Sequence, residues 1–168
     1  FGIKRKKVPK GLPAWIKAIP LSKTAHGSGH LQKRLWRLVS DYVRIRDWNN
    51  YGKCIATNQG LASWQYGQAG HYRSYNECNG MFKFHPMNIH LQTAQSNAWP
   101  TSQTWETFQN GLRQRYGMGV IDEIDTANRN TPPKITTDLI LGKIKSMLKD
   151  MERLPEHPDY YERVMRLL

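Results

Sequence analysis

A helical repeat of apolar residues near the start of the chain does most to limit the folds available to it. Leu31, Leu35, Leu38, Tyr42 and Ile45 follow the i, i+4, i+7 spacing of a single helix face. Most of the basic side chains in this stretch fall elsewhere around the helix. The pattern predicts a helix of about four turns that begins at Leu31 and ends within residues 47–52.

The C-terminal half carries further helix signals. Residues 101–117 begin with Thr and Ser caps and end at a glycine, which is typical of a complete helix. Residues 119–128, 136–154 and 158–168 continue the helical pattern, with breaks at 130–133, Pro155 and Pro158. We therefore expect this half of the chain to be helical.

Short β-prone runs separated by glycines lie between these two helical regions. Within residues 53–74 the runs predict a β-hairpin, with His71 on or just after its second strand. A short helix is expected over residues 91–98, closed by Pro100. The expected fold class is therefore α+β, with a long helix before the strands and a helical C-terminal half.

Composition limits the class of protein further. The 168 residues are enough for one domain, and an apolar fraction of 39% with six Trp and eight Tyr predicts a buried core. No apolar run is long enough to span a membrane, and the basic start lacks the apolar segment of a signal peptide. The start without Met suggests a trimmed chain. Cys54 and Cys78 are expected to be free thiols in a reducing cytoplasm.

The net charge of +12 is unevenly distributed. Residues 1–50 hold twelve Lys and Arg against two acids, whereas residues 119–168 hold eight against nine. This asymmetry predicts a polyanionic partner on the N-terminal side. The candidate DNA-binding residues are Lys4, Arg5, Lys6, Lys7, Arg34, Arg37 and Arg44. A solubilising tail or localisation signal for the first four, and a solvated helix face for the others, are the alternatives.

Three polar residues have a spacing that suits hydrolysis of a phosphodiester. His71 lies at an expected strand end, Asn88 opens a turn seventeen residues later, and Asn97 lies nine further on in a short helix. A nuclease needs a base to deprotonate water and a cation to neutralise charge on the phosphate. A neutral imidazole supplies the base near pH 7, and an amide oxygen suits a hydrated Mg²⁺.

These residues resemble the HNH, or ββα-metal, nucleases, and most closely the NinG (Rap) recombination proteins of lambdoid phages. The resemblance is carried by "AGHYRS", "FKFHPMNIH" and "QTAQSN", and continues through "LRQRYG" and "IDEI". It implies a ββα-metal core in which His71 is the base, Asn88 braces the backbone that carries the base, and Asn97 holds Mg²⁺ or Mn²⁺. Asn88 as an ordinary turn residue remains the alternative.

The chain departs from that family at the zinc-binding cysteines. Many relatives have two C-x-x-C pairs for one structural zinc, whereas the matching positions here are Cys54 with Thr57, and Thr93 with Ser96. One thiolate cannot hold a tetrahedral zinc. We therefore expect no structural zinc, and expect packing of nearby aromatic side chains to replace its stabilising effect.

A second departure leaves one metal ligand open. Many HNH enzymes place an Asp before the base, where this chain has Gly70. His90, Gln68 and His85 are candidates for the second ligand, with His90 favoured and a structural histidine as its alternative. Arg73 is assigned to clamp the phosphate, with a simple surface cation as its alternative.

Three functions are compatible with these observations. The first is a structure-specific endonuclease that cuts branched recombination intermediates, such as Holliday junctions or D-loops, in the cytoplasm of a bacterial host or phage-infected cell. A sequence-specific nicking or homing HNH endonuclease and a non-catalytic DNA-binding accessory protein are the alternatives. The expected organisation is a basic flexible arm (1–30), a helix with the nuclease core (31–118) and a helical extension (119–168), which offers a surface for a homodimer or packs on its own core.

Overall fold

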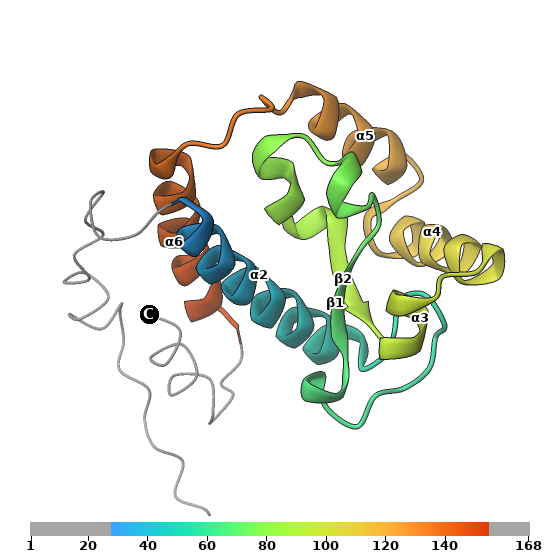
Figure 1. Ribbon diagram of the computed structural model, residues 1–168. Helices are drawn as coiled ribbons and strands as arrows, with labels where there is room; N and C mark the ends of the chain where they lie inside the picture. Colours follow the sequence, from blue (N-terminus) through green and yellow to red (C-terminus); the bar gives the residue numbers. More distant parts are fainter. Residues whose placement is uncertain (1–27, 155–168) are drawn as a thin grey trace, which may run out of the picture.

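The computed structural model describes residues 28–154, and its architecture is α+β, as predicted. Five α-helices within this range surround a sheet of two antiparallel strands (Figure 1). The predicted basic arm, apart from its last three residues, and the predicted helix at 158–168 lie outside the described residues. No helix between residues 28 and 154 has the length and apolarity needed to cross a membrane.

Helix α2, Ser28–Tyr51, is longer than predicted. Residues 28–30 were expected to end the flexible arm because they include a glycine, but they form the first turn of this helix. Burial of Leu31 and Leu35 behind that turn explains the difference, since tertiary packing outweighs the low helix propensity of glycine. The predicted apolar face is otherwise correct.

The sheet pairs different segments from those predicted. Strand β1, Gln68–His71, lies antiparallel to β2, Ile89–Gln92, with Gly70 opposite His90 and His71 opposite Ile89. The hairpin expected within residues 53–74 is wrong, because residues 53–67 form a loop with a single bridge between Lys53 and Gly60. This loop lies against β2, where the Ile55 amide donates to the Leu91 carbonyl at 3.0 Å.

The connection from β1 to β2 consists of three short 3-10 helices, Tyr75–Glu77, Gly80–Phe84 and Pro86–Asn88. A further 3-10 turn, Trp64–Tyr66, precedes β1. Helix α3 follows β2 but covers only Ala94–Ala98, so the expected start at Leu91 is wrong. Thr93 caps the helix by accepting from the Ser96 amide, which leaves Leu91 and Gln92 in the strand.

The helices of the C-terminal half agree with the prediction. Helix α4 covers Ser102–Tyr116 and ends at Gly117, α5 covers Val120–Asn130, and α6 covers Thr137–Glu152. Thr101 and Thr136 cap α4 and α6 by accepting from backbone amides. The break at 130–133 separates α5 from α6 as expected.

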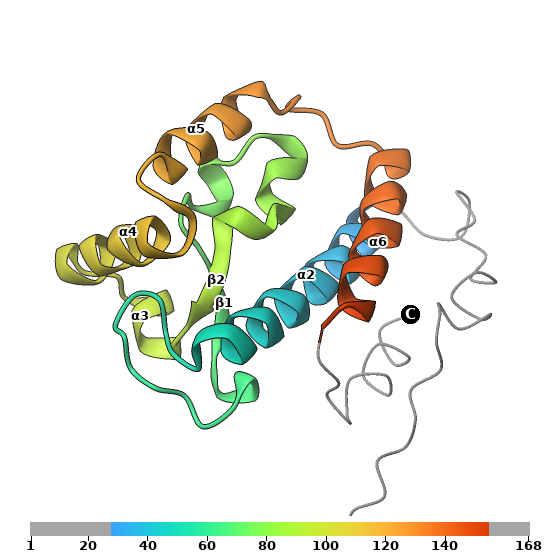
Figure 2. The ribbon, with the colours of Figure 1, turned by 180° about the vertical axis from the view of Figure 1, so that it is seen from behind.

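Two hydrophobic cores hold the strands in place. The first joins α2 to α6, whose buried side chains Ile140, Ile144, Met147, Leu148 and Met151 pack against the leucines and valines of α2. Figure 2 shows α6 along the side of α2 that faces away from the sheet. The second core joins Tyr72 and the 3-10 connection to α4 and α5. The apolar face of α6 therefore packs against α2 of the same chain.

Candidate functional site

A cavity of about 300 Å³ lies where the sheet meets α3 and the start of α4. Its polar lining includes His71 from β1, Gln92 from β2, Asn97 from α3 and Glu77 from the connection between the strands. Aromatic side chains complete the wall on the α4 side. Two residues of the predicted site, His71 and Asn97, thus line one cavity although they are 26 positions apart.

The imidazole of His71 is held in a defined orientation. Its Nε2 lies 2.8 Å from the Lys83 carbonyl oxygen, and its ring stacks on Trp36 of α2 with centroids 5.0 Å apart. Because a carbonyl only accepts, Nε2 must carry the proton, and Nδ1 of the neutral ring then has a free electron pair. Burial lowers the pKa of His71, outweighing the opposing effect of the Lys83 carbonyl. The ring is therefore neutral at pH 7.

Asn88 braces the backbone that follows His71. Its Oδ1 accepts from the Arg73 amide at 2.8 Å, and its Nδ2 donates to the Arg73 carbonyl at 3.0 Å. The Tyr72 amide donates to the Asn88 carbonyl at 2.7 Å. The residue is fully buried. A side chain that only formed a turn would not need this two-way pairing with a neighbouring strand end.

Asn97 is exposed on α3, and its amide is positioned by β1. Its Nδ2 donates to Gln68 Oε1 at 2.9 Å, so Oδ1 is the end that remains available to accept. That oxygen lies beside Gly70, close enough for a Cβ there to overlap it. The arrangement fits a hydrated divalent cation bound through an amide oxygen. No three His, Cys, Asp or Glu side chains between residues 28 and 154 gather into a metal site.

The sequence matches the protein-family model described as Bacteriophage Lambda NinG protein over residues 21–156. The chain belongs to the NinG family. No curated protein and no solved structure matches the sequence. The family match agrees with the resemblance carried by the His71, Asn88 and Asn97 segments.

In this member of the NinG family His90 does not reach the cavity. The residue is fully buried, with Nδ1 2.9 Å from Asp47 Oδ2 and Nε2 3.1 Å from the Met87 carbonyl. Both ring nitrogens are therefore engaged, and the favoured assignment of His90 as a metal ligand is wrong. Its place on β2 opposite Gly70 points it toward α4 and the end of α2 instead.

His90 belongs to a buried charged group that we call the Asp47 cluster. Its members are Asp47, His90, Arg46 and Arg115. Arg46 Nε and Arg115 Nη1 donate to the Asp47 carboxylate at 2.7 and 3.0 Å. Burial alone would raise the pKa of Asp47, but His90 and Arg46 outweigh it and hold the pKa well below its usual range. The cluster joins α2, β2 and α4.

The other two candidates for a second metal ligand do not line the cavity. Gln68 is on β1, but its Oε1 accepts from Asn97. His85 lies in the 3-10 connection, where its Nδ1 accepts from the Met87 amide at 3.3 Å and its ring stacks on Phe82. His85 does not line the cavity.

Arg73 has a protein partner rather than an open guanidinium. Its Nε and Nη2 donate to the two carboxylate oxygens of Asp125 on α5, each at 2.7 Å. The hydrogen bonds to Asp125 raise the pKa of Arg73. The expected phosphate clamp is therefore engaged in an ion pair, because a carboxylate on α5 matches the fork of the guanidinium.

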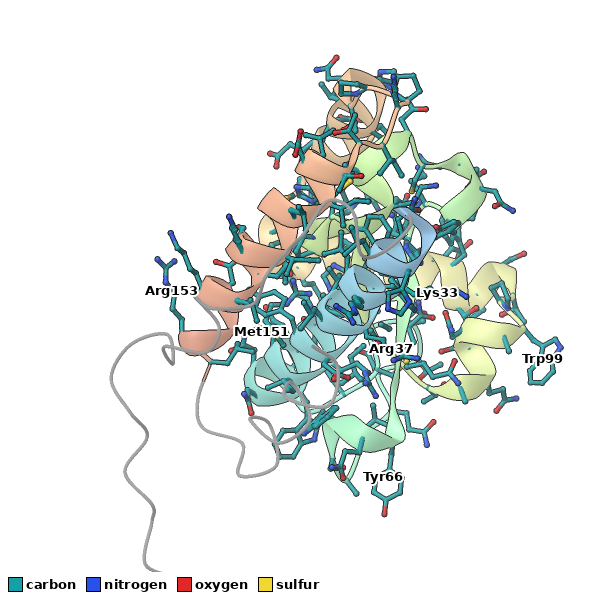
Figure 3. All side chains as sticks on the ribbon, turned by 60° about the vertical axis from the view of Figure 1, so that its left-hand side comes forward. Lys33, Arg37, Tyr66, Trp99, Met151 and Arg153 are labelled. Carbon is teal, nitrogen blue, oxygen red and sulfur yellow. The ribbon has the colours of Figure 1, made fainter. Side chains whose placement is uncertain are left out.

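The predicted DNA-binding residues divide into three groups. Lys4, Arg5, Lys6 and Lys7 lie outside the described residues. Arg44 is directed inward, where it pairs with Asp41 and lies over the Trp64 ring, so its assignment to DNA is corrected. Arg34 is half-buried and Arg37 exposed on α2. Figure 3 shows Arg37 with Lys33, which sequence analysis left out, on the same stretch of that helix.

The four positions that the resemblance matches to zinc-binding cysteines lie together in the structure. The Cys54 thiol lies 3.5 Å from Ser96 Oγ and accepts from the Thr93 amide at 3.3 Å. Thr93 Oγ1 donates to Ser96 Oγ at 3.0 Å, and Thr57 hydrogen-bonds to the thiol. We call this group the Cys54 cluster. Although burial alone would raise the pKa of Cys54, these hydrogen bonds lower it.

The sequence did not single out several residues of the site, among them Gln92 and Trp36. Gln92 lines the cavity from β2, but it was assigned to a helix expected to begin at Leu91. The alternation of apolar and polar residues over 89–92 is typical of a strand and could have placed Gln92 on the same face as His90. Trp36 supports His71 from α2, and no local pattern distinguished it from other half-buried positions of that helix.

Proposed function

We propose that this protein is a metal-dependent endonuclease that hydrolyses phosphodiester bonds in branched DNA formed during recombination, with His71 as the general base. One observation carries the proposal. His71 is a neutral, rigidly held imidazole, and it lines the same cavity as the amide of Asn97. That pairing supplies a base and an oxygen ligand in one place.

The base assignment rests on the tautomer. Nε2 is committed to the Lys83 carbonyl, which leaves Nδ1 to take the proton of an attacking water. Stacking on Trp36 fixes the plane of the ring, and the pairing of Asn88 with Arg73 fixes the end of the strand. Such fixed geometry reduces the reorganisation needed at the moment of reaction.

The cofactor proposed for the site is Mg²⁺ or Mn²⁺, held by Asn97 and water. A bound divalent cation would neutralise the charge that grows on the scissile phosphate. Glu77 also lines the cavity, and hydrogen bonds from Ser74 lower its pKa, so it adds a negative charge near the site.

The surface beside the cavity suits a branched nucleic acid. Lys33 and Arg37 are exposed on α2, close to the Trp36 that supports His71. Trp99 is 74% exposed, immediately before Pro100 of the cavity wall, and projects away from the body in Figure 3. Cations bind phosphates without reading sequence, and an exposed indole can stack on an unpaired base.

The test is cleavage of a four-way junction, a flap and a linear duplex, side by side, with Mg²⁺ or Mn²⁺. We expect the branched substrates to be cut, and His71→Ala to lower the rate by about 10²–10⁴-fold. His85→Ala is the matched control, because it removes a half-buried histidine that does not line the cavity.

Each alternative function has its own result in that experiment. Binding without cleavage in either metal would favour a non-catalytic accessory protein. Cleavage of one duplex sequence regardless of branching would favour a sequence-specific HNH enzyme. Equal cleavage by wild type and His71→Ala would refute the base assignment.

A further inference from the structure

Gly70 occupies a position where a side chain has no room. A Cβ built there would overlap Nε2 of Gln92 and Oδ1 of Asn97. Gly70 does not have a positive φ; within residues 28–154 the glycines that do are Gly52, Gly80 and Gly117. The backbone itself would therefore accept an alanine. An added Cβ would instead displace the ends of the two amide side chains that lie beside Gly70.

The strand pairing explains why those amides meet. Gln68 lies opposite Gln92 and Gly70 opposite His90, so these four residues share the face of the sheet that Asn97 approaches from α3. Only 3% of Gln92 is exposed, and it lines the cavity that also contains His71. The two amide groups of Gln92 and Asn97 consequently lie a few ångströms apart.

One end of the Gln92 amide lies beside a hydroxyl. Its Oε1 is 3.4 Å from Ser96 Oγ, whose one proton also has the Thr93 carbonyl as an acceptor at 3.3 Å, and Nε2 lies toward Gly70 and Asn97. A hydroxyl both donates and accepts, so Ser96 can hold either end of the amide. A half-turn about the last torsion of Gln92 preserves this hydrogen bond and places Oε1 beside Asn97 Oδ1.

We propose that Gln92 supplies the second protein oxygen of the cation site, alongside Asn97, in the space that Gly70 leaves open. This assignment rests on the proposed nuclease function and replaces His90 as the second ligand. It also gives the Cys54 cluster a role in the site, since Ser96 belongs to that cluster and holds the Gln92 amide.

The proposed ligands predict how the site binds a cation. Both amides are neutral, so protein alone should bind weakly and leave most waters on the ion. Glu77 lines the same cavity, and DNA phosphates would add further negative charge, so the affinity should rise when DNA is bound. A Glu at position 92 has nearly the same shape and supplies that charge within the protein.

The experiment measures Mn²⁺ binding to the full chain by electron paramagnetic resonance, with and without DNA. All variants carry His71→Ala so that the DNA is not cleaved during the measurement. We expect Gln92→Ala and Asn97→Ala each to weaken binding by about tenfold or more. Gln92→Glu should tighten binding by about tenfold or more. Gln95→Ala is the matched control, because Gln95 is exposed on α3 and does not line the cavity.

Folding is checked on the same samples by circular dichroism, and the nearly isosteric Gln92→Glu keeps the test valid if Gln92→Ala is unstable. The assignment is overturned if Gln92→Glu leaves Mn²⁺ affinity unchanged, or if Gln92→Ala binds like wild type while Asn97→Ala does not. Mn²⁺ binding that depends on Gln92, in a wild-type protein that cuts no DNA, would support the site and refute the nuclease function.

Discussion

Two histidines on adjacent rungs of the same small sheet have opposite surroundings. His90 is fully buried, and its two nitrogens lie against the Asp47 carboxylate and the Met87 carbonyl. His71 has one nitrogen bound to a carbonyl and lines a cavity with its ring. A histidine with both nitrogens engaged can join elements together, whereas one with a nitrogen left open can exchange a proton. Burial alone does not separate these roles; the hydrogen-bond partners do.

Asp47→Asn should show the largest effect on stability. Loss of the carboxylate leaves Arg46 and Arg115 buried without their counter-charge, which we expect to cost about 3–5 kcal/mol in the free energy of unfolding. Urea unfolding followed by circular dichroism measures it. His71→Ala should lose less, about 0.5–1.5 kcal/mol, mainly from its stacking on Trp36. Equal losses would remove the distinction between the two histidines.

The pH dependence of cleavage should follow the protonation of His71. Because burial lowers the pKa of this histidine, the neutral base persists to a more acidic pH than an ordinary histidine allows. We expect kcat/KM to be flat at neutral pH and to fall about tenfold per unit on the acid side, with its inflection below about 6.5. An inflection above that value, or the same inflection in the residual activity of His71→Ala, would assign the titration to another group.

The Asp47 cluster should control stability in acid. The folded-state pKa of Asp47 is depressed, so its contribution is fully present above the unfolded-state pKa of about 4 and is lost as the pH falls below it. The difference in unfolding free energy between wild type and Asp47→Asn should therefore shrink as the pH falls below about 4. A difference that grows below that pH would contradict the assignment.

Arg73→Gln should have a smaller effect. Its ion pair with Asp125 is partly exposed, at 32% and 26% of the two side chains, so we expect a loss below about 1 kcal/mol. Asp125→Asn should match it in stability and in cleavage if Arg73 only joins β1 to α5. If KM rises in Arg73→Gln but not in Asp125→Asn, the result would support the assignment of Arg73 to phosphate binding.

Removal of divalent metal should have the smallest effect on stability. We expect EDTA to abolish cleavage but to change the melting temperature very little, because the Cys54 cluster is closed by hydrogen bonds without a metal. Differential scanning calorimetry with and without EDTA measures this. A large drop in melting temperature would reveal a structural metal.

The sequence predicted the elements that have strong local signals. The apolar repeat of α2 and the Thr cap of α4 both reflect contacts within a few turns of chain. The strand pairing was wrong because β1 and β2 have four residues each and are joined by 3-10 helices that leave no clear periodicity. The partners of His90, Arg73 and Arg44 depend on side chains from distant elements, and no local pattern specifies them.

Helix α2 contacts both histidines and so fixes their positions relative to each other. Trp36 supports His71, and Asp47 holds His90, eleven residues further along the same helix, or about 16 Å of rise. A one-residue insertion between them would turn one contact by about 100° relative to the other, so both could not be kept. The number of residues between Trp36 and Asp47 therefore cannot change without loss of one contact. The length of the 3-10 connection between the strands is not limited by these two contacts.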